Sequence, residues 1–144
     1  MTIETFLTKP YWIIDILPKQ VPANSSGQYF AIEKHLLSSP QVDCIYRKFA
    51  GVLLALNCYH DITIQDGDKW IKNPEPGTIE RLVLERKPLN LLIDSSQAMI
   101  SITGDDHYMT LYGPNKDLLE LTTTVALAHG LHVWKPKNNN NKNV

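Results

Sequence analysis

Hydrophobic side chains recur along this chain with the spacing of strands in some segments and of helices in others. Residues 11–17 are rich in β-branched and aromatic side chains and stop at Pro18, which predicts a strand inside a sheet. Residues 29–37 carry apolar side chains at helical spacing, behind a possible cap at Ser25 or Ser26. The chain is therefore predicted to begin with a strand and a helix.

The longest helical pattern follows Ser39 and Pro40, residue types that favour the cap and the first turn of a helix. From Val42 to Leu56 the apolar side chains form one stripe, so this helix should pack on the core. Gly51 weakens the helical pattern by about 1 kcal/mol relative to Ala. Residues 52–56 therefore also fit a short buried strand, although the stripe favours a helix.

The centre of the chain predicts a strand, a turn and a loop. Residues 58–65 alternate between apolar and polar side chains, as a half-buried strand does, and the dipeptide at 66–67 supplies a turn. Residues 69–72 combine two lysines with Trp70. We interpret them as a solvated loop in which Trp70 packs against the body of the protein.

A helix and a three-stranded meander are predicted next. Asn73 offers a cap, Pro74 suits the first turn, and Pro88 ends the helical pattern. The strands that follow are joined by loops short enough for antiparallel hairpins. These strands comprise residues 89–94, 98–103 and 108–112.

A further helix and a final strand complete the pattern. Pro114 and Asn115 open the helix, and Gly130 suits the left-handed backbone conformation that often follows a helix end. Residues 131–134 form the predicted strand, which stops before Pro136.

These elements have the order β-α-α-β-α-β-β-β-α-β. Such a mixture predicts an α+β fold, a two-layer sandwich in which helices cover one face of a mainly antiparallel sheet. A chain of 144 residues suits one core, so we expect a single α+β domain over residues 1–136. Residues 137–144 are almost entirely Asn and Lys, and we expect them to form a disordered tail.

Alternation in the last strands separates aliphatic from aromatic side chains, because neighbours on a strand point to opposite faces of the sheet. We expect the aliphatic set to contact the helices. The opposite face then carries Tyr108, Thr110, Tyr112, His132 and Trp134, with Met99 beside them. Tyr, Trp and Met are enriched in interface cores, so this face is the first candidate for binding a protein partner or a second copy.

The same face has a second interpretation. The loops around Asn24 and Lys72, or the N-terminal segment, can fold over it and bury it within the monomer. Large exposed apolar patches are uncommon on monomers, so the pattern leaves both interpretations open.

A second candidate site is acidic. Asp94, Asp105, Asp106 and His107 offer carboxylate and imidazole groups, which bind divalent metals and serve in acid–base catalysis. Gly104 followed by two aspartates is also what a hairpin turn requires, and the sequence lacks HxH, HExxH and DxDxDG spacings. The turn interpretation is therefore favoured, and no metal is predicted.

Composition narrows the functional classes. The chain is 43% hydrophobic and 20% charged, with a net charge of −1, which is typical of a globular protein and gives no field that attracts nucleic acid or a membrane surface. Cys44 and Cys58 are expected to be buried thiols in a cytoplasmic protein without a signal peptide. No GxSxG or glycine-rich phosphate loop is present, so no cofactor is predicted.

Three functional hypotheses follow. The favoured one is a small non-catalytic binding or interaction protein, for example an inhibitor or immunity-type protein, that uses the aromatic face. The second is a small metal-dependent enzyme that uses the Asp/His cluster, and the third is a homodimer paired through the aromatic face. The strand–helix–strand ending between Tyr108 and Pro136 is similar to that of small bacterial proteins, and no residue role is carried over from it.

Overall fold

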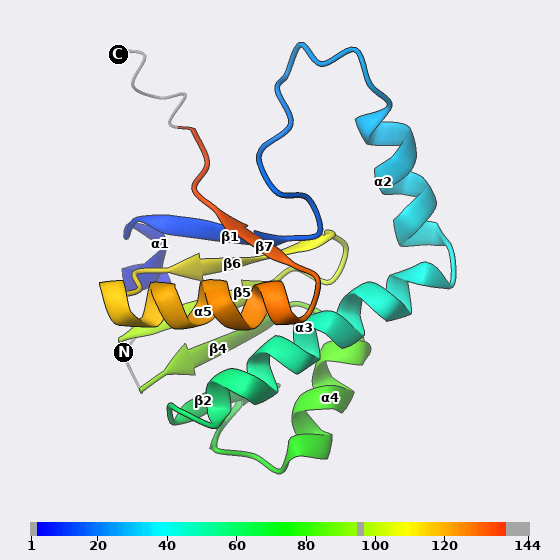
Figure 1. Cartoon of the computed structure of the whole chain (residues 1–144). Helices are drawn as coiled ribbons and strands as arrows, with labels where there is room; N and C mark the ends of the chain where they lie inside the picture. Colours follow the sequence, from blue (N-terminus) through cyan, green and yellow to red (C-terminus); the bar gives the residue numbers. More distant parts are fainter. Residues whose placement is uncertain (1–2, 95–96, 138–144) are drawn as a thin grey trace.

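The computed structural model describes residues 3–94 and 97–137, which form one sheet with helices around it (Figure 1). The predicted α+β class and element order are confirmed, with a short N-terminal helix and one further strand in addition. The elements are α1 (Ile3–Leu7), β1 (Tyr11–Asp15), α2 (Tyr29–Ser38), α3 (Gln41–Asn57), β2 (Ile62–Asp66), β3 (Lys69–Lys72), α4 (Pro76–Leu84), β4 (Leu89–Ile93), β5 (Ala98–Ile102), β6 (Tyr108–Tyr112), α5 (Lys116–Ala128) and β7 (His132–Trp134).

The sheet has the strand order β3-β2-β4-β5-β6-β1-β7, and each neighbouring pair is antiparallel. The hairpins β4–β5 and β5–β6 form the predicted meander. The first strand, β1, lies between β6 and β7, so the two ends of the chain meet in the sheet. The expectation that this strand lies inside the sheet is therefore confirmed.

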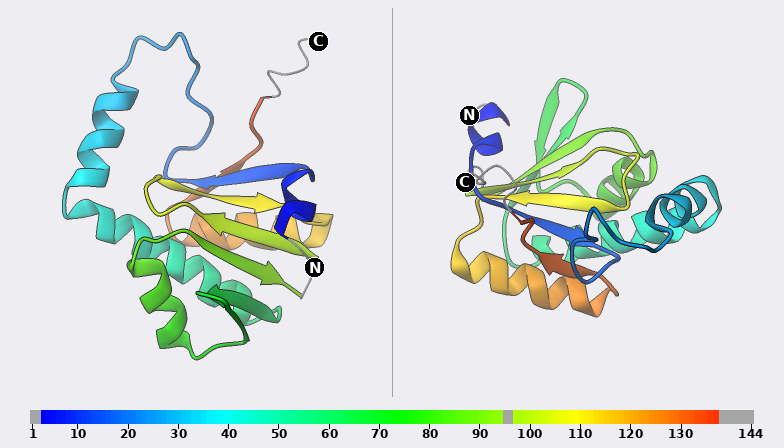
Figure 2. Two further views of the ribbon diagram at one scale, coloured as in Figure 1. Left: turned by 180° about the vertical axis from the view of Figure 1, so that it is seen from behind. Right: turned by 90° about the horizontal axis from the view of Figure 1, so that it is seen from above.

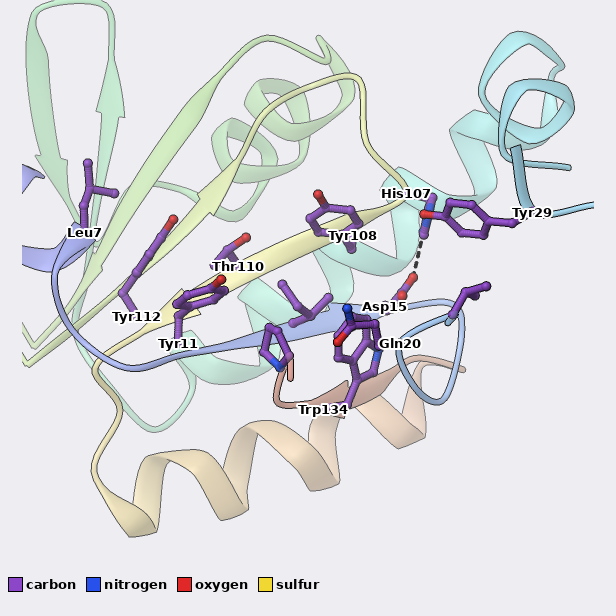
Figure 3. Close-up of a pocket in the computed structure, with 13 residues that line it drawn as sticks. Leu7, Tyr11, Asp15, Gln20, Tyr29, His107, Tyr108, Thr110, Tyr112 and Trp134 are labelled. Carbon is purple, nitrogen blue, oxygen red and sulfur yellow. Dashed lines mark hydrogen bonds and ion pairs between the residues drawn. The ribbon is translucent and has the colours of Figure 1, made fainter. Parts of the chain in front are cut away.

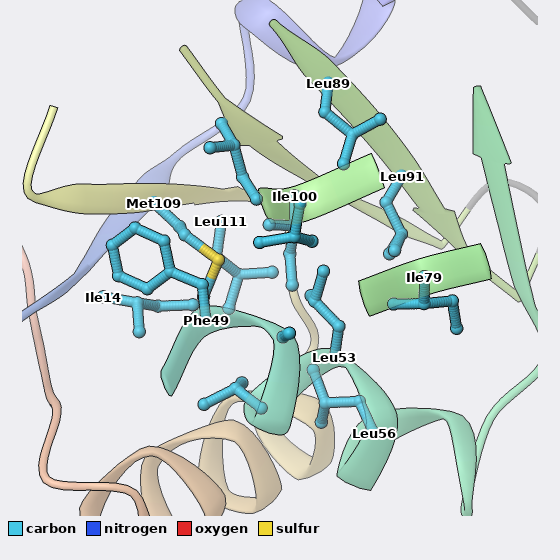
Figure 4. Close-up of a cluster of buried hydrophobic side chains, with 14 of the residues drawn as sticks. Ile14, Phe49, Leu53, Leu56, Ile79, Leu89, Leu91, Ile100, Met109 and Leu111 are labelled. Carbon is cyan, nitrogen blue, oxygen red and sulfur yellow. The ribbon is translucent and has the colours of Figure 1, made fainter. Parts of the chain in front are cut away.

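One face of the sheet packs on the helices, as Figures 2 and 4 show. Buried side chains of α3, α4 and α5 join the aliphatic side chains of the strands in one continuous core. The members at its centre include Phe49, Leu53, Ile100, Met109 and Leu111. Burial of this apolar area supplies the main stabilisation of the fold.

The other face carries the aromatic set, as predicted. On β6, Met109 and Leu111 are buried on the helical side, whereas Tyr108, Thr110 and Tyr112 are half-buried on the opposite side. This face lacks α3, α4 and α5, and we call it the helix-poor face. The short helix α1 lies on it (Figure 2).

The predicted long helix is continuous, which excludes the alternative of a strand at residues 52–56. Gly51 has a packing role within it. A Cβ atom at this position would lie 2.6 Å from a ring carbon of His129, at the end of α5. Glycine therefore allows α3 and α5 to approach each other closely.

Two predictions on side-chain burial and loops are wrong. Cys44 and Cys58 are exposed, because Cys44 lies on the outer side of the amphipathic α3 and Cys58 follows its last turn. Residues 69–72 form strand β3, paired with β2 around a turn at Gly67, and Trp70 is 40% exposed. The backbone pairing of this hairpin outweighs the polar composition of the segment.

Two helix starts also differ from prediction. Helix α2 begins at Tyr29, well after Ser25, whose Oγ accepts a hydrogen bond from the Gly27 amide. Helix α4 begins at Pro76, because Asn73 has a different role: its Oδ1 accepts from the Ile62 amide at 2.9 Å. By contrast, Asn115 does cap α5, where it accepts from the Leu118 amide, and Gly130 is left-handed at φ 75°.

Most of the predicted tail, residues 138–144, lies outside the described residues. Lys137 is described, and its amide donates to Gln20 Oε1 at 2.8 Å. No helix in the described part of the chain is long and apolar enough to cross a membrane.

Replacing Leu53 with Ala should lower the free energy of unfolding by about 2–5 kcal/mol, because it opens a cavity at the centre of the core. Leu127 on α5 is 57% exposed, so Leu127→Ala is the matched control and should change the value by less than about 0.5 kcal/mol. Urea unfolding of both variants measures the difference. Equal losses would contradict a core centred on α3.

Candidate functional site

A pocket with a volume of about 510 Å³ opens on the helix-poor face, over β1, β6 and β7 (Figure 3). Four of the five residues predicted for binding line it: Tyr108, Thr110, Tyr112 and Trp134. We call it the sheet pocket. His132 lies on the same face, opposite Asp15 in the register, but it is not among the lining residues.

Strand β1 provides the middle of the sheet pocket. Tyr11, Ile13 and Asp15 alternate onto this face and lie opposite the three pocket residues of β6 in the antiparallel register. The rings of the directly opposed pair Tyr11 and Tyr112 lie 5.7 Å apart between centroids and are tilted by 41°. The pairing of two strands that are far apart in sequence therefore produces a row of aromatic side chains.

Segments outside the sheet supply the other walls. The connection between β1 and α2 contributes Gln20 and Val21, and Pro136 comes from the segment after β7. The hydrogen bond from the Lys137 amide to Gln20 ties these two segments together. The walls therefore come from the beginning, the middle and the end of the chain.

Helix α1 covers another part of the helix-poor face. Phe6 packs with Leu92 and Met99 in a small second core, and all three side chains are buried. Met99, expected beside the aromatic set, is thus covered by the N-terminal segment. The covering that we considered in the sequence holds for this part of the face, while Tyr112 and Trp134 stay half-buried at the pocket.

One end of the sheet pocket is formed by a buried histidine and its partners. His107 Nδ1 lies 2.7 Å from Asp15 Oδ1, and the two residues are only 2% and 1% exposed. On the other side of the ring, Nε2 lies 2.9 Å from the hydroxyl of Tyr29 and 3.2 Å from Glu33 Oε2. We call these four residues the His107 cluster, which links β1 and the residue just before β6 to α2. Figure 3 shows three of its members, Asp15, His107 and Tyr29.

The His107 cluster favours the protonated imidazole. Burial alone lowers the pKa of His107, but the hydrogen bond to Asp15 and the charges of Asp15 and Glu33 outweigh it and raise the pKa above its ordinary value. A protonated ring donates from both nitrogens, which suits acceptors on its two sides.

Three tyrosines of the sheet pocket, Tyr29, Tyr108 and Tyr112, stay neutral. Burial, followed by the charge of Glu33, raises the pKa of Tyr29 to about 12. Burial, followed by the charge of Asp106, raises the pKa of Tyr108 to about 12. Burial also raises the pKa of Tyr112. Their hydroxyl groups therefore act as hydrogen-bond donors and acceptors, and none is an activated nucleophile.

An Asp–His pair is the arrangement that orients a general base in many enzymes. Here Nε2, the nitrogen that would act on a substrate, contacts Tyr29 and Glu33, and the His107 side chain is almost completely buried. In this geometry the pair holds the pocket wall in place. Beside this pair, the pocket lining presents aromatic rings and neutral polar groups.

The structure does not gather the acidic candidates into one site. Asp94 follows β4 and pairs with His60 at 2.7 Å, at the opposite end of the sheet from His107. Asp105 and Asp106 both accept from Thr103 Oγ1 at 2.8 Å, within the β5–β6 turn. Among the residues that the structure describes, no group of three His, Cys, Asp or Glu side chains is placed to hold a metal ion.

The sequence reasoning did not single out Tyr11, Asp15, Tyr29 or Glu33. One signal was present for Asp15, which is the single acidic residue in an otherwise apolar predicted strand. A buried carboxylate needs a charged or hydrogen-bonding partner, so an acidic residue at this position indicates a histidine, a basic residue or another donor close by in the fold. Tyr29 and Glu33 carried no such signal, because both fit an ordinary exposed helix.

Comparisons of the chain with models of protein families, with curated proteins and with solved structures find no match.

The raised pKa of His107 predicts a pH-dependent contribution to stability. The protonated ring stabilises the fold fully below its ordinary pKa of about 6.5, and this contribution is lost as the pH rises through the higher pKa of the folded state. The advantage of the wild type over His107→Gln in the free energy of unfolding should therefore be largest in mild acid and decrease at higher pH. Urea unfolding at several pH values measures it.

His35→Gln is the matched control, because His35 is exposed on α2. Its difference from the wild type should not follow the same pH profile. A constant difference between wild type and His107→Gln across this pH range would contradict the assigned role of the Asp15–His107 contact.

Proposed function

We propose that this protein is a non-catalytic binding protein and that the sheet pocket is its binding site. One observation carries the proposal: Tyr108, Thr110, Tyr112 and Trp134, chosen by strand alternation alone, line a single pocket. Aromatic residues with polar groups at their ends provide large contact areas and fixed hydrogen bonds, as binding sites require.

The rigidity of the pocket supports the proposal. Its floor consists of paired strands, and a buried charge pair between Asp15 and His107 fixes one end. A preformed site loses little conformational entropy when a ligand binds. The volume of about 510 Å³ lies in the range of roughly 300–1,000 Å³ that is common for ligand pockets.

The other two hypotheses have less support. The acidic residues of the metal-dependent enzyme hypothesis are engaged in a turn and in a separate pair with His60. A homodimer through the aromatic face would use a surface that is concave at the pocket and partly covered by α1. We therefore place the bound molecule in the pocket.

The test compares three tagged proteins: the wild type, Tyr112→Ala/Trp134→Ala and Trp70→Ala. Trp70 is an exposed aromatic residue at the far edge of the same sheet and serves as the matched control. Proteins and small molecules that remain bound after purification from source cells are identified by mass spectrometry. We expect one set for the wild type and Trp70→Ala, and its loss from the pocket variant.

Folding is checked in parallel, because truncating two half-buried side chains removes packing as well as contacts. Tyr112→Phe, which keeps the ring, is used if the double variant unfolds. Identical bound sets for all variants would contradict the proposal. A doubled mass in light scattering that the pocket variant loses would instead support the homodimer.

A further inference from the structure

The sheet pocket has no unpaired charge in its lining. Its two charged residues, Asp15 and His107, are paired with each other and nearly buried. All the other polar lining groups are neutral: the hydroxyls of tyrosine and threonine side chains, the Gln20 amide and the Trp134 indole. A charged ligand that left water for this site would find no free partner of opposite charge, which is costly.

Charges around the pocket reinforce this selection. Asp106, Glu33 and Asp15 all act on Tyr108, so an anion at that end of the pocket meets several carboxylates. A cation at the same end finds these carboxylates already engaged: Asp15 and Glu33 by His107, and Asp106 by the Thr103 hydroxyl. An anion is therefore repelled, and a cation has no free carboxylate with which to pair.

The indole of Trp134 requires an acceptor. Its Nε1 is buried and has no hydrogen-bond partner among the residues that the structure describes, although the side chain lines the pocket. An indole N–H can only donate, and a buried donor without an acceptor is destabilising. A ligand oxygen at this place would satisfy it.

The rest of the lining presents ring faces and hydroxyl groups together. Tyr11 and Tyr112 lie as a tilted pair on one side, and Tyr29 and Tyr108 lie at the end near His107 (Figure 3). The negative face of an aromatic ring attracts weakly positive C–H groups, while the hydroxyls both donate and accept. A ligand that has apolar C–H faces and hydroxyl groups at its rim matches both features.

An extended peptide fits this site less well. Peptides commonly bind to sheets by adding a strand at an edge, where backbone groups are unpaired. The pocket lies on a face, and its central strand β1 is paired on both sides by β6 and β7. Recognition at the pocket therefore uses side chains. Their aromatic rings and hydroxyl groups suit a ligand whose own ring carries several hydroxyl groups.

We infer that the sheet pocket binds an uncharged saccharide, with a ring oxygen or hydroxyl that accepts from Trp134 and the sugar C–H face on the tyrosine rings. This inference rests on the proposed function and deepens it, since it names the ligand class of the same pocket.

The test is a titration of the full-length ¹⁵N-labelled protein, in which the indole signal of Trp134 is followed by NMR. The probes are methyl glycosides of glucose, galactose, mannose and N-acetylglucosamine, each with its uronic acid or amino sugar counterpart, together with neutral disaccharides. We expect at least one neutral saccharide to shift the Trp134 signal saturably. The anionic and cationic counterparts should bind at least roughly tenfold more weakly.

Three variants separate contact from folding. Trp134→Phe keeps an aromatic ring but removes the indole N–H donor, so it should weaken binding of the neutral saccharide about tenfold. Tyr112→Ala removes a ring contact and should weaken the same binding by about the same factor. For Trp134→Phe, the backbone amides around the pocket report binding. Trp70→Phe, outside the pocket, should leave the affinity unchanged.

Each contrary result has a distinct meaning. Tighter binding of a charged sugar, or equal binding by the Trp134→Phe variant, would overturn the saccharide inference. If no saccharide shifts the Trp134 signal but the molecule identified from source cells does, the inference fails and the proposed function stands. If neither saccharides nor any copurifying molecule affects the pocket, both fail.

Discussion

The constraint on which this structure depends is the alternation of side chains across a single antiparallel sheet. Every strand must present one set of residues to the helices, and those sets are aliphatic, so α3, α4 and α5 find a continuous apolar surface. The same alternation leaves the other set on the helix-poor face. Because β1 lies between β6 and β7, aromatic residues from both ends of the chain meet there. The alternation that places aliphatic side chains in the core therefore also places the pocket residues on the opposite face.

A buried charge pair adds a second layer of organisation. Asp15 is buried on β1, and its carboxylate is paired with His107, the residue that immediately precedes β6. The opposite side of the imidazole contacts Tyr29 and Glu33, which belong to a helix with no buried residue of its own. Helix α2 is therefore held beside the sheet by these polar contacts and by Leu36 and Leu37, which are partly buried and pack against the core.

The elements that the sequence predicted well are those with a local cause. Alternation specified the strands of the meander, Asn115 specified a helix start, and Gly130 specified a helix end. Features with a distant cause were not accessible: Asp15 and His107 are 92 residues apart, and β3 exists because β2 pairs with it. The exposure of Cys44 depends on how a helix is oriented against the sheet, which general preferences of cysteine for burial do not determine. The binding role of the aromatic residues stays a prediction.

The pocket walls come from β1, the segment that follows β1, β6, and the residues after β7. The Lys137–Gln20 hydrogen bond joins the segment after β1 to the residues after β7. These segments are far apart in the sequence, so the pocket forms only when the chain is folded. A ligand that needs the whole pocket therefore binds only the folded state. By thermodynamic linkage, such a ligand raises the free energy of unfolding. Above its Kd, this increase grows with the logarithm of the free ligand concentration. A ligand that occupied this pocket would therefore also raise the melting temperature of the protein.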